Sequence, residues 1–388
     1  MRLLIAGGGT GGHIYPALAV VDALRRRPNP PELRWLGGHR GIEDRIVPAA
    51  GIKLHRLALR SLRSTDRDIH LALDPVRLVL SIPEALAFLV GERPAAIFTT
   101  GGYVAIPVLL AARLLRIPTL IWEGNVIPGR SVRATARLAS VMAVSFAITC
   151  DALQAESAEG GRPCLETGTP IRDFSGTDAL AARQHFGVRA GERLILVFGG
   201  SQAVRRLNEA VSASLATLVE RYHVLHVTGE AGYASALVDR EALPDDLRSR
   251  YRATSFLGTE MAAALAASDL VVGRAGSSTL AEVTAVGVPM VLVPYPHAGG
   301  HQRANADVLD KAGAALVIED ADFSGEALLA AASILDDPAR HARMASAARA
   351  LGRPGAADAL AAVLMALAER RPLPTASETT ALARTPPS

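Results

Sequence analysis

The stretch that decides the fold is Arg2-Leu3-Leu4-Ile5-Ala6-Gly7-Gly8-Gly9-Thr10-Gly11-Gly12-His13, at the start of the chain. An aliphatic run with strand character leads directly into a cluster of glycines, and a segment with helical spacing follows. Strand, glycine loop and helix in this order are typical of the first unit of a parallel α/β sheet. The same order returns in the second half, where an apolar run over 194–198 leads into Gly199-Gly200-Ser201.

Short aliphatic runs alternate with longer Ala/Leu-rich segments along both halves, which is typical of repeated βα units. The strands that we expect cover 2–6, 32–36, 95–99, 119–122, 141–145, 194–198, 223–227, 270–272, 290–293 and 315–318. We therefore predict an α/β chain with two Rossmann-like, doubly wound parallel sheets that face each other across a cleft.

The predicted domain boundaries follow from this repeat. The first domain covers 1–168, the second covers 169–355, and a helix over 356–370 packs back on the first. The Thr/Ala/Pro-rich stretch 372–388 is expected to be a disordered tail.

Composition excludes several classes of protein. Among 388 residues, 41 Lys and Arg against 38 Asp and Glu leave a net charge of +3, which is too small for a protein that coats nucleic acid. The 49% hydrophobic content is enough for large cores, so disorder over most of the chain is excluded. The start of the chain has no signal-peptide pattern, and prolines and arginines interrupt the longest apolar stretch, 104–121, so we expect no membrane-spanning helix.

The two cysteines, Cys150 and Cys164, are 14 residues apart, with neither a CxxC motif nor a nearby pair of histidines. This spacing argues against a zinc site and against a disulfide framework. It favours a reducing compartment.

The first glycine cluster formally matches the dinucleotide fingerprint as Gly7-x-Gly9-x-x-Gly12. That fingerprint also requires an acidic residue at the end of the second strand to hold a ribose. The second strand here ends in Gly37-Gly38-His39-Arg40, without Asp or Glu. Binding of a phosphorylated nicotinamide cofactor remains an alternative, because His39 and Arg40 suit a 2′-phosphate.

His13 follows the glycines directly and lies near the N-terminus of the helix that they open. Glycines let a ligand approach the backbone closely, and a helix N-terminus offers N–H groups to an anion. An imidazole has an ordinary pKa near 6.5, so at neutral pH it can accept a proton from a reacting hydroxyl. The alternative is a histidine that only hydrogen-bonds its own turn.

A second group of polar residues opens the helix after the strand over 270–272. Ser277, Ser278 and Thr279 provide hydroxyls and amides for an anion, and Glu282 lies one turn further on, where it can accept hydrogen bonds from ribose hydroxyls. An ordinary capped helix with a solvated glutamate is the alternative.

A third group follows the strand over 290–293. His301, Gln302 and Asn305 lie at the carboxyl end of that strand, the edge where open α/β sheets bind ligands, and their amides and imidazole suit sugar hydroxyls. Metal binding by His297 and His301 is the competing interpretation, although no carboxylate or cysteine is close to them in sequence.

Taken together, these motifs resemble the MurG family, the peptidoglycan N-acetylglucosamine transferases that convert lipid I to lipid II. The motifs that carry the resemblance, in the family's order, are Gly8-Gly9-Thr10-Gly11-Gly12-His13-Ile14-Tyr15-Pro16-Ala17, Thr100-Gly101-Gly102-Tyr103, Trp122-Glu123-Gly124-Asn125, Gly199-Gly200-Ser201-Gln202, Arg274-Ala275-Gly276 with Glu282, and His301-Gln302-x-x-Asn305. The similarity extends from about Met1 to Ile318.

The resemblance implies an inverting transferase of the GT-B type that needs neither a metal nor a cofactor. Its substrates would be UDP-N-acetylglucosamine and lipid I, and it would not bind nucleic acid. The resemblance places His13, Tyr103 and Glu123 on the acceptor side, with His13 as the base for the 4-hydroxyl of N-acetylmuramic acid and Glu123 as the other candidate. The residues that it assigns to substrate binding are Thr10, Gly11, Gly12, Asn125, Arg172, Ser201, Leu257, Ser277, Ser278, Thr279, Glu282, His301, Gln302 and Asn305.

A lipid acceptor also implies contact with an anionic membrane surface, at the cytoplasmic face of the bacterial inner membrane. A basic series precedes the apolar segment 76–90, and it consists of Arg56, Arg60, Arg63 and Arg67. The apolar face that we expect to insert consists of Leu78, Ile82, Leu86 and Leu89. The alternative is an ordinary core helix beside a solvated basic loop.

Two further functions remain as alternatives. One is a GT-B transferase that uses another acceptor, such as a soluble glycoside or a diacylglycerol. The other is a UDP-N-acetylglucosamine epimerase, which shares the fold and is expected to carry extra carboxylates facing the sugar and to release UDP from the donor alone.

Overall fold

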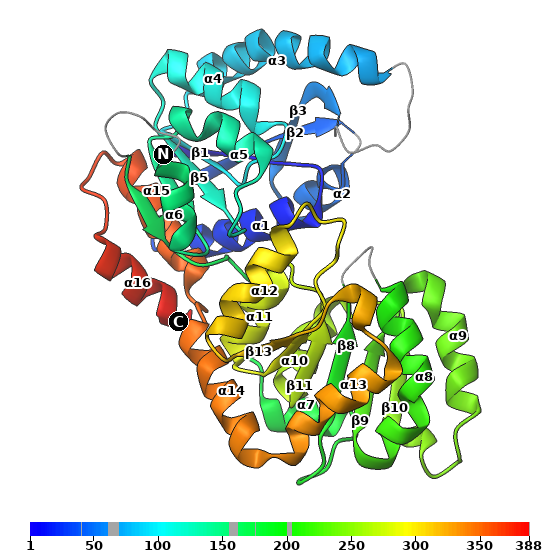
Figure 1. Ribbon diagram of the computed structural model, residues 1–388. Helices are drawn as coiled ribbons and strands as arrows, with labels where there is room; N and C mark the ends of the chain where they lie inside the picture. The colour runs from blue at the N-terminus through cyan, green and yellow to red at the C-terminus, as the bar shows by residue number, and fades with distance from the viewer. Residues whose placement is uncertain (40, 61–69, 155–161, 175, 200–203, 388) are drawn as a thin grey trace. The chain divides into compact units, whose positions relative to one another are not determined.

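The computed structural model describes residues 1–39, 41–60, 70–154, 162–174, 176–199 and 204–387. The chain divides into two compact units (Figure 1). The first unit comprises Met1–Arg172 and Arg353–Pro387, and the second comprises Asp173–Gly352.

The first unit is built on a parallel sheet of seven strands in the order β3-β2-β1-β4-β5-β6-β7. The strands are β1 (Arg2–Ala6), β2 (Glu32–His39), β3 (Lys53–Arg60), β4 (Ala96–Thr99), β5 (Thr119–Glu123), β6 (Val141–Val144) and β7 (Cys164–Glu166). The helices of this unit are α1 (Gly11–Arg25), α2 (Glu43–Ala49), α3 (His70–Glu92), α4 (Ala105–Leu115), α5 (Arg130–Thr135), α6 (Ile148–Gln154), α15 (Ala356–Ala368) and α16 (Ala376–Arg384). Strand β1 lies inside the sheet between β2 and β4, and its Ile5 is in register with Trp35 on one side and with Phe98 on the other.

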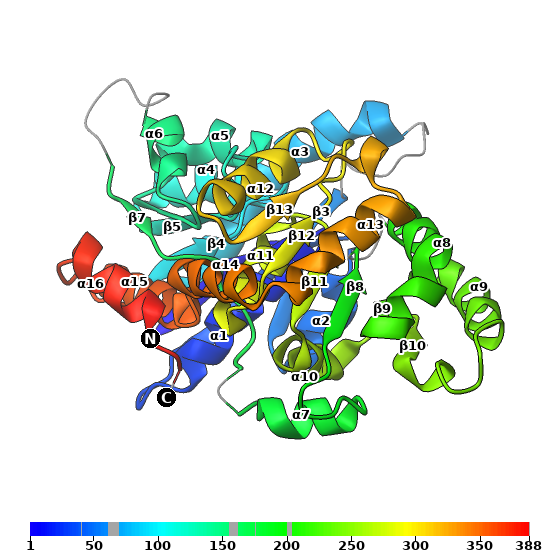
Figure 2. The ribbon, with the colours of Figure 1, turned by 60° about the horizontal axis from the view of Figure 1, so that its bottom comes forward.

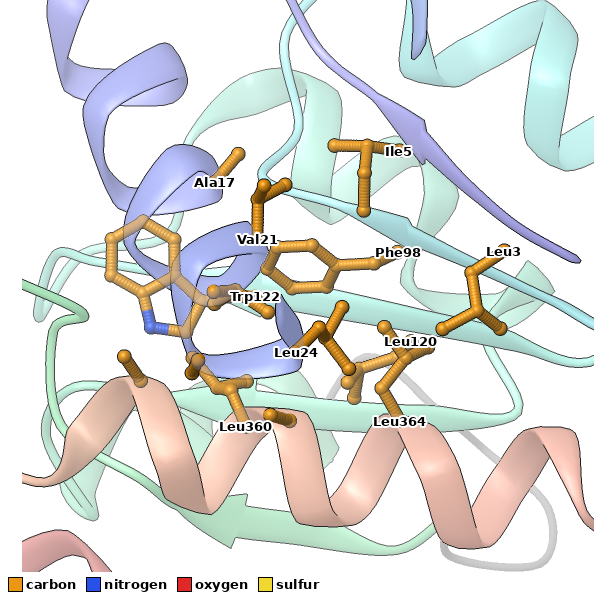
Figure 3. Close-up of a cluster of buried hydrophobic side chains, with 14 of the residues drawn as sticks. Leu3, Ile5, Ala17, Val21, Leu24, Phe98, Leu120, Trp122, Leu360 and Leu364 are labelled. Atoms are coloured by element: carbon orange, nitrogen blue, oxygen red, sulfur yellow. The ribbon is translucent and has the colours of Figure 1, made fainter. Parts of the chain in front are cut away.

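Helix α15 joins the first unit although it lies almost 200 residues after the last strand of that sheet. Its Leu360 and Leu364 are fully buried against α1 and the sheet, beside Leu24 and Trp122 (Figure 3). The Trp122 indole also donates a hydrogen bond to the carbonyl oxygen of Gly168, at 3.0 Å. This apolar packing supplies the energy that holds the returning helix in place.

The second unit is built on a parallel sheet of six strands in the order β10-β9-β8-β11-β12-β13. The strands are β8 (Leu194–Phe198), β9 (His223–Val227), β10 (Tyr251–Thr254), β11 (Leu270–Gly273), β12 (Met290–Leu292) and β13 (Ala315–Val317). Its helices are α7 (Ala179–His185), α8 (Arg205–Arg221), α9 (Gly229–Glu241), α10 (Met261–Ala267), α11 (Ser277–Val286), α12 (His301–Lys311), α13 (Gly325–Ala332) and α14 (Pro338–Leu351). Helices α8 and α13 pack together over this sheet (Figure 2). The prediction of two doubly wound parallel sheets is confirmed.

Three strands were not expected from the sequence: β3, β7 and β10. All three are edge strands, the first two on the seven-stranded sheet and the third on the six-stranded sheet. An edge strand has one neighbour and more contact with solvent, so its residues need not be apolar. β3 reads Lys-Leu-His-Arg-Leu-Ala-Leu-Arg and β10 reads Tyr-Arg-Ala-Thr, which lack the continuous aliphatic runs of the central strands.

The expected disordered tail over 372–388 contains an ordered helix, α16. Thr375 and Glu378 form a capping box at its N-terminus, and Thr379 and Ala383 are fully buried. The helix packs on α15 and on β7 (Figure 2). A reciprocal cap and a small apolar face therefore order a stretch whose composition predicts disorder.

The prediction that Leu78, Ile82, Leu86 and Leu89 form a face of α3 that inserts into a membrane is wrong for three of these residues, which pack in the core. Leu89 is 1% exposed, and Leu78 and Leu86 pack against the core beneath the helix. The exposed apolar side chains are instead those of Val76, Val79, Leu80 and Val90. Of the basic series that precedes the helix, Arg56 is ion-paired with Asp44 at 2.5 Å, while Arg63, Arg67 and the side chain of Arg60 lie outside the described part of the chain.

Cys150 and Cys164 form a disulfide, with their Cα atoms 5.8 Å apart, so the expectation of unpaired cysteines is wrong. Cys150 lies on α6, and Cys164 begins β7, which pairs with β6 in the register Met142↔Cys164. The crossover from α6 back to the sheet thus brings the two thiols together. Local spacing carries no information on a pair that tertiary structure closes.

Candidate active site

The site of the first unit lies where the strand order reverses. The chain runs outward from β1 to β3 and then starts again beside β1 with β4, so the loops after β1 and β4 are neighbours at the carboxyl edge of the sheet. The first of these loops leads into Gly11, the first residue of α1, and the second spans Thr100–Tyr103 before α4. This reversal point is where doubly wound sheets bind ligands. The predicted residues Thr10, Gly11, Gly12 and His13 all lie here.

The imidazole of His13 is held by the loop after β4. Its Nδ1 atom lies 2.8 Å from the carbonyl oxygen of Thr100, and the Thr100 hydroxyl donates to the carbonyl oxygen of His13 at 3.0 Å. A carbonyl can only accept, so Nδ1 carries the hydrogen of the neutral imidazole. Nε2 is then the basic nitrogen, which leaves His13 in the tautomer that a general base requires.

Glu123, at the end of β5, is 5% exposed, and its two oxygens hold the following loop. Oε1 accepts from the backbone N–H of Asn125 at 2.8 Å and from the Asn125 side-chain amide at 3.0 Å. Oε2 accepts from the backbone N–H of Gly129 at 2.8 Å. The structure thus brings Glu123 and Asn125 together, and the Glu123 carboxylate braces the loop that follows β5, that is, it holds the backbone of that loop in place.

Tyr103 is 8% exposed, and its hydroxyl lies 3.5 Å from Oε1 of Glu43. Burial, and then the charge of Glu43, raise the pKa of the Tyr103 phenol far above neutrality. The phenol therefore stays protonated at pH 7 and can donate a hydrogen bond but cannot act as a base.

Two further side chains, which the sequence motifs do not predict, belong to this site. Glu43, the first residue of α2, is fully buried against the first glycine loop, where its Oε2 accepts from the N–H of Gly9. Ser131, in α5, accepts from the N–H of Gly102 at 3.1 Å. In the sequence, Glu43 is only an acidic residue two positions after Gly41, and its partners lie on separate segments of the chain.

In the second unit the strand order reverses between β8 and β11. The segment after β11 leads through Gly276 into α11, whose first residues are Ser277, Ser278 and Thr279. The N-cap residue is Gly276, which has no side chain to cap the helix, and the three hydroxyl residues and Glu282 are half-buried. Ser201, which was predicted to bind the same substrate, lies outside the described residues.

Gln302 on α12 holds the segments after β11 and after β12, and Asn305 on the same helix holds the segment after β11. Oε1 of Gln302 accepts from the backbone N–H of Tyr295 at 2.9 Å and from that of Ala275 at 3.3 Å. Asn305 is fully buried and donates through Nδ2 to the carbonyl oxygen of Ala275 at 3.2 Å. The structure therefore brings these two predicted residues together with the start of α11, and Asn305 supports that segment from beneath.

The other predicted residues lie around these two sheet edges. Leu257 is buried before the short 3-10 turn Gly258–Glu260, whereas its neighbour Phe256 is 74% exposed. His301 begins α12, and Arg172 is the exposed last residue before the chain enters the second unit. Within the described part of the chain, no three His, Cys, Asp or Glu side chains gather as a metal site.

Comparisons with known proteins agree with this geometry. Residues 3–144 match the glycosyltransferase family 28 N-terminal domain, and residues 194–360 match the family's C-terminal domain. The UDP-N-acetylglucosamine--N-acetylmuramyl-(pentapeptide) pyrophosphoryl-undecaprenol N-acetylglucosamine transferase of Desulforudis audaxviator is 39% identical, with 95% of this chain and 99% of that protein covered. The protein of the same name from Chlorobaculum parvum is 37% identical, with 95% and 100% covered.

Solved structures give the same result. The crystal structure of Acinetobacter baumannii MurG is similar with a TM-score of 0.75 and 28% identity, covering 94% of this chain and 99% of that one. A UDP-N-acetylglucosamine 2-epimerase structure from Listeria monocytogenes has a TM-score of 0.68 but only 16% identity, so it shows the shared fold alone. The family resemblance of the sequence motifs is thus confirmed. The chain belongs to glycosyltransferase family 28 and, within it, to the MurG family.

Proposed function

We propose that this chain transfers N-acetylglucosamine from UDP-N-acetylglucosamine to the 4-hydroxyl of N-acetylmuramic acid in lipid I, forming lipid II. The names of its relatives in the MurG family support this substrate pair. The observation that carries the chemistry is the hydrogen bond from His13 Nδ1 to the carbonyl oxygen of Thr100, because it sets the basic Nε2 atom of the imidazole.

The reaction is a single displacement at the anomeric carbon. The acceptor oxygen forms a bond to that carbon while the bond to the UDP phosphate oxygen breaks with its electron pair. Nε2 of His13 takes the hydroxyl proton, and the imidazolium later releases it to water. One displacement inverts the anomeric centre, so the α-linked donor yields a β-linked product.

The departing UDP gains negative charge, and the start of α11 can stabilise it. Amides at the N-terminus of a helix and the helix dipole both favour an anion. Ser277, Ser278 and Thr279 contribute these amides and their hydroxyls, and Glu282 would accept hydrogen bonds from the ribose. On this account the protein, and not a metal ion, stabilises the leaving group.

Four of the predicted residues act in this proposal by holding others in place. Glu123 braces the Asn125 loop, and Asn305 supports the segment that leads into α11. Gln302 accepts from the N–H of Ala275 in the same segment through its oxygen, and we infer that its amide N–H groups donate to the transferred sugar. Tyr103 acts as a protonated partner of Glu43.

Contact with a membrane surface is the remaining part of the proposal, since lipid I carries a prenyl chain. On α3, Val76, Val79 and Leu80 are 54%, 63% and 62% exposed, and successive turns bring them to one side of the helix. A short apolar row of this kind can lie in the interface without spanning the bilayer. We therefore propose a peripheral enzyme at the cytoplasmic face of the membrane, with this row as the contact.

The test is incubation with UDP-N-acetylglucosamine labelled in the sugar and a lipid I analogue. We expect a labelled, β-linked disaccharide on the lipid, and none on a soluble glycoside or on diacylglycerol. Labelled product on either of those acceptors would instead assign another transferase activity. Release of UDP and N-acetylmannosamine from the donor alone would assign an epimerase.

A further inference from the structure

Glu43 is a fully buried carboxylate that hydrogen-bonds to backbone amides. Oε2 accepts from the N–H of Gly9 at 3.0 Å, and Oε1 accepts from the N–H of Gly38 at 3.3 Å. No ion pair among the described side chains includes Glu43. A buried carboxylate without a cation is costly unless hydrogen bonds satisfy it, so these two amides matter to its placement.

The glycines around Glu43 provide the space that the carboxylate fills. A Cβ atom at Gly8 or at Gly41 would overlap with its oxygens, and one at Gly37 would lie 3.1 Å from its Cγ atom. In a dinucleotide-binding fold, glycines of this kind make room for the phosphates of a ligand. Here they make room for an anion that the chain itself supplies.

The carboxylate also reaches the second segment that holds His13. Oε1 is 3.5 Å from the hydroxyl of Tyr103, which ends the Thr100–Tyr103 loop. Thr100 in that loop binds Nδ1 of His13, and Gly9 lies four residues before His13 in the other segment. Glu43 therefore contacts both segments around the imidazole, the first through the backbone N–H of Gly9 and the second through the side-chain hydroxyl of Tyr103.

Two backbone amides of the loop after β4 also donate hydrogen bonds to side chains of this protein. The N–H of Gly101 donates to the hydroxyl of Thr99, and that of Gly102 donates to the hydroxyl of Ser131, each at 3.1 Å. With Gly9 bound to Glu43, three loop amides are satisfied by side-chain oxygens. These hydrogen bonds fix the shape of both loops before any ligand binds.

We propose that Glu43 is a positioning residue for the transfer reaction. Its carboxylate fills the first glycine loop, ties that loop to the one after β4, and so sets the orientation and tautomer of His13. The expected effect on turnover rests on the proposed function. The expected effect on the His13 ring does not depend on it. This role of Glu43 also explains why the first glycine loop matches the dinucleotide fingerprint although the second strand does not end in the acidic residue that would bind a ribose.

The test compares Glu43→Gln with Glu84→Gln. In Glu43→Gln one oxygen becomes an N–H₂ group, which faces the N–H of Gly9 or of Gly38 and cannot accept from it. Glu84 is a matched control, because its Oε2 also accepts from a backbone N–H, that of Ala58, at 3.0 Å, but it lies on α3. Two readouts are measured: steady-state kinetics with lipid I analogue, and ¹⁵N NMR of the imidazoles, in which His13 is assigned by its loss in His13→Gln.

We expect Glu43→Gln to lower kcat by about 10- to 100-fold, the cost of a small misplacement of a catalytic group, while KM for UDP-N-acetylglucosamine is unchanged. The His13 resonances should move from the Nδ1–H tautomer toward a mixture. Glu84→Gln should match the wild type in both readouts. Wild-type kcat together with a wild-type His13 spectrum in Glu43→Gln would overturn the proposal.

The two readouts separate this proposal from the proposed function. A wild type that does not transfer the sugar, with a His13 spectrum that still changes in Glu43→Gln, would refute the function and keep the positioning role. If Glu43→Gln does not fold, Glu43→Asp takes its place, because its shorter carboxylate cannot reach both amides. Failure of both variants to fold would contradict the proposal, which assigns Glu43 to the loops and not to the core.

Discussion

Hydrogen bonds distinguish the roles of the three candidate catalytic residues of the first unit. His13 donates through Nδ1 to a carbonyl, so its other nitrogen is basic. Glu123 uses both oxygens to hold backbone amides, and Tyr103 is a buried phenol whose pKa is raised. The motifs predict all three residues. The sequence does not show which of them is a base and which holds a loop in place, because that depends on the atoms that each side chain contacts.

Glu123→Gln tests the brace interpretation. The variant loses one acceptor for the loop amides at a buried position, so we expect it to lower the free energy of unfolding by about 1–3 kcal/mol. Its kcat/KM should keep the pH dependence of the wild type, because the proposed base, His13, is unchanged. Measurement of kcat/KM against pH decides the point. A loss of about 10²–10⁴-fold that abolishes the acidic limb would make Glu123 the base instead.

His226 in β9 supports a prediction on stability. It is 2% exposed, with Nε2 facing the side-chain oxygen of Asn208 and Nδ1 facing the hydroxyl of Tyr251, each at 2.9 Å. Burial lowers the pKa of His226 to about 4. The unfolded chain takes up a proton near pH 6.5 while the folded one does not, so the second unit loses stability as the pH falls from about 6.5 to about 4.

The expected loss is about 3 kcal/mol at pH 4, measured as the opening free energy of β8 and β9 by hydrogen exchange. His226→Gln should lack this part of the pH dependence, and His55→Gln, at an exposed histidine, should retain it. Identical curves for wild type and His226→Gln would show that His226 is not the titrating group.

At the scale of elements, what could be predicted follows from burial. The central strands are buried on both faces, and their aliphatic runs predict them correctly. The edge strands β3, β7 and β10 escaped prediction because solvent tolerates their polar residues. Helix α16 and the Cys150–Cys164 disulfide escaped because tertiary contacts create them. Glu43 escaped for the same reason, since its partners lie on three separate segments.

Helix α3 has the right composition for an interface, but its two faces had to be assigned by the structure. A continuous apolar segment does not indicate which face of the helix is buried. In the structure, the face that carries Leu89 packs against the core. The opposite side, with Val76, Val79 and Leu80, is the one that we expect to contact lipid.

The double variant Val79→Glu/Leu80→Glu tests this contact by flotation with vesicles that contain anionic lipid. We expect wild type to float and the double variant to remain at the bottom, because two carboxylates oppose burial in the interface and are repelled by the lipid. Val238→Glu, at a valine on α9 that is 70% exposed, is the control and should float. Equal flotation of all three proteins would remove α3 from the membrane contact.

At the scale of the whole molecule, the proposed reaction is divided between the two units. We propose that the first unit holds the imidazole that takes the acceptor proton, and that the second holds the helix start and the carboxylate for the donor. Each of these proposed groups lies near the point where the strand order of its own sheet reverses. Changes in the first unit should therefore act on turnover, and changes in the second on donor affinity.

Glu282→Gln provides the second half of this comparison. Loss of the charged acceptor for the ribose hydroxyls should weaken binding of UDP-N-acetylglucosamine by about 10- to 100-fold, since a hydrogen bond to a charged group contributes about 1.5–3 kcal/mol. Titration calorimetry with the donor measures this directly. An unchanged Kd would move the ribose contact away from Glu282.

The most direct test of the central claim is turnover of His13→Ala with a lipid I analogue, with donor affinity measured on the same protein. We predict a kcat lower by about 10²–10⁴-fold, with an unchanged Kd for UDP-N-acetylglucosamine. A variant that turns over as fast as the wild type would contradict the account, because the reaction would then have no need of the imidazole.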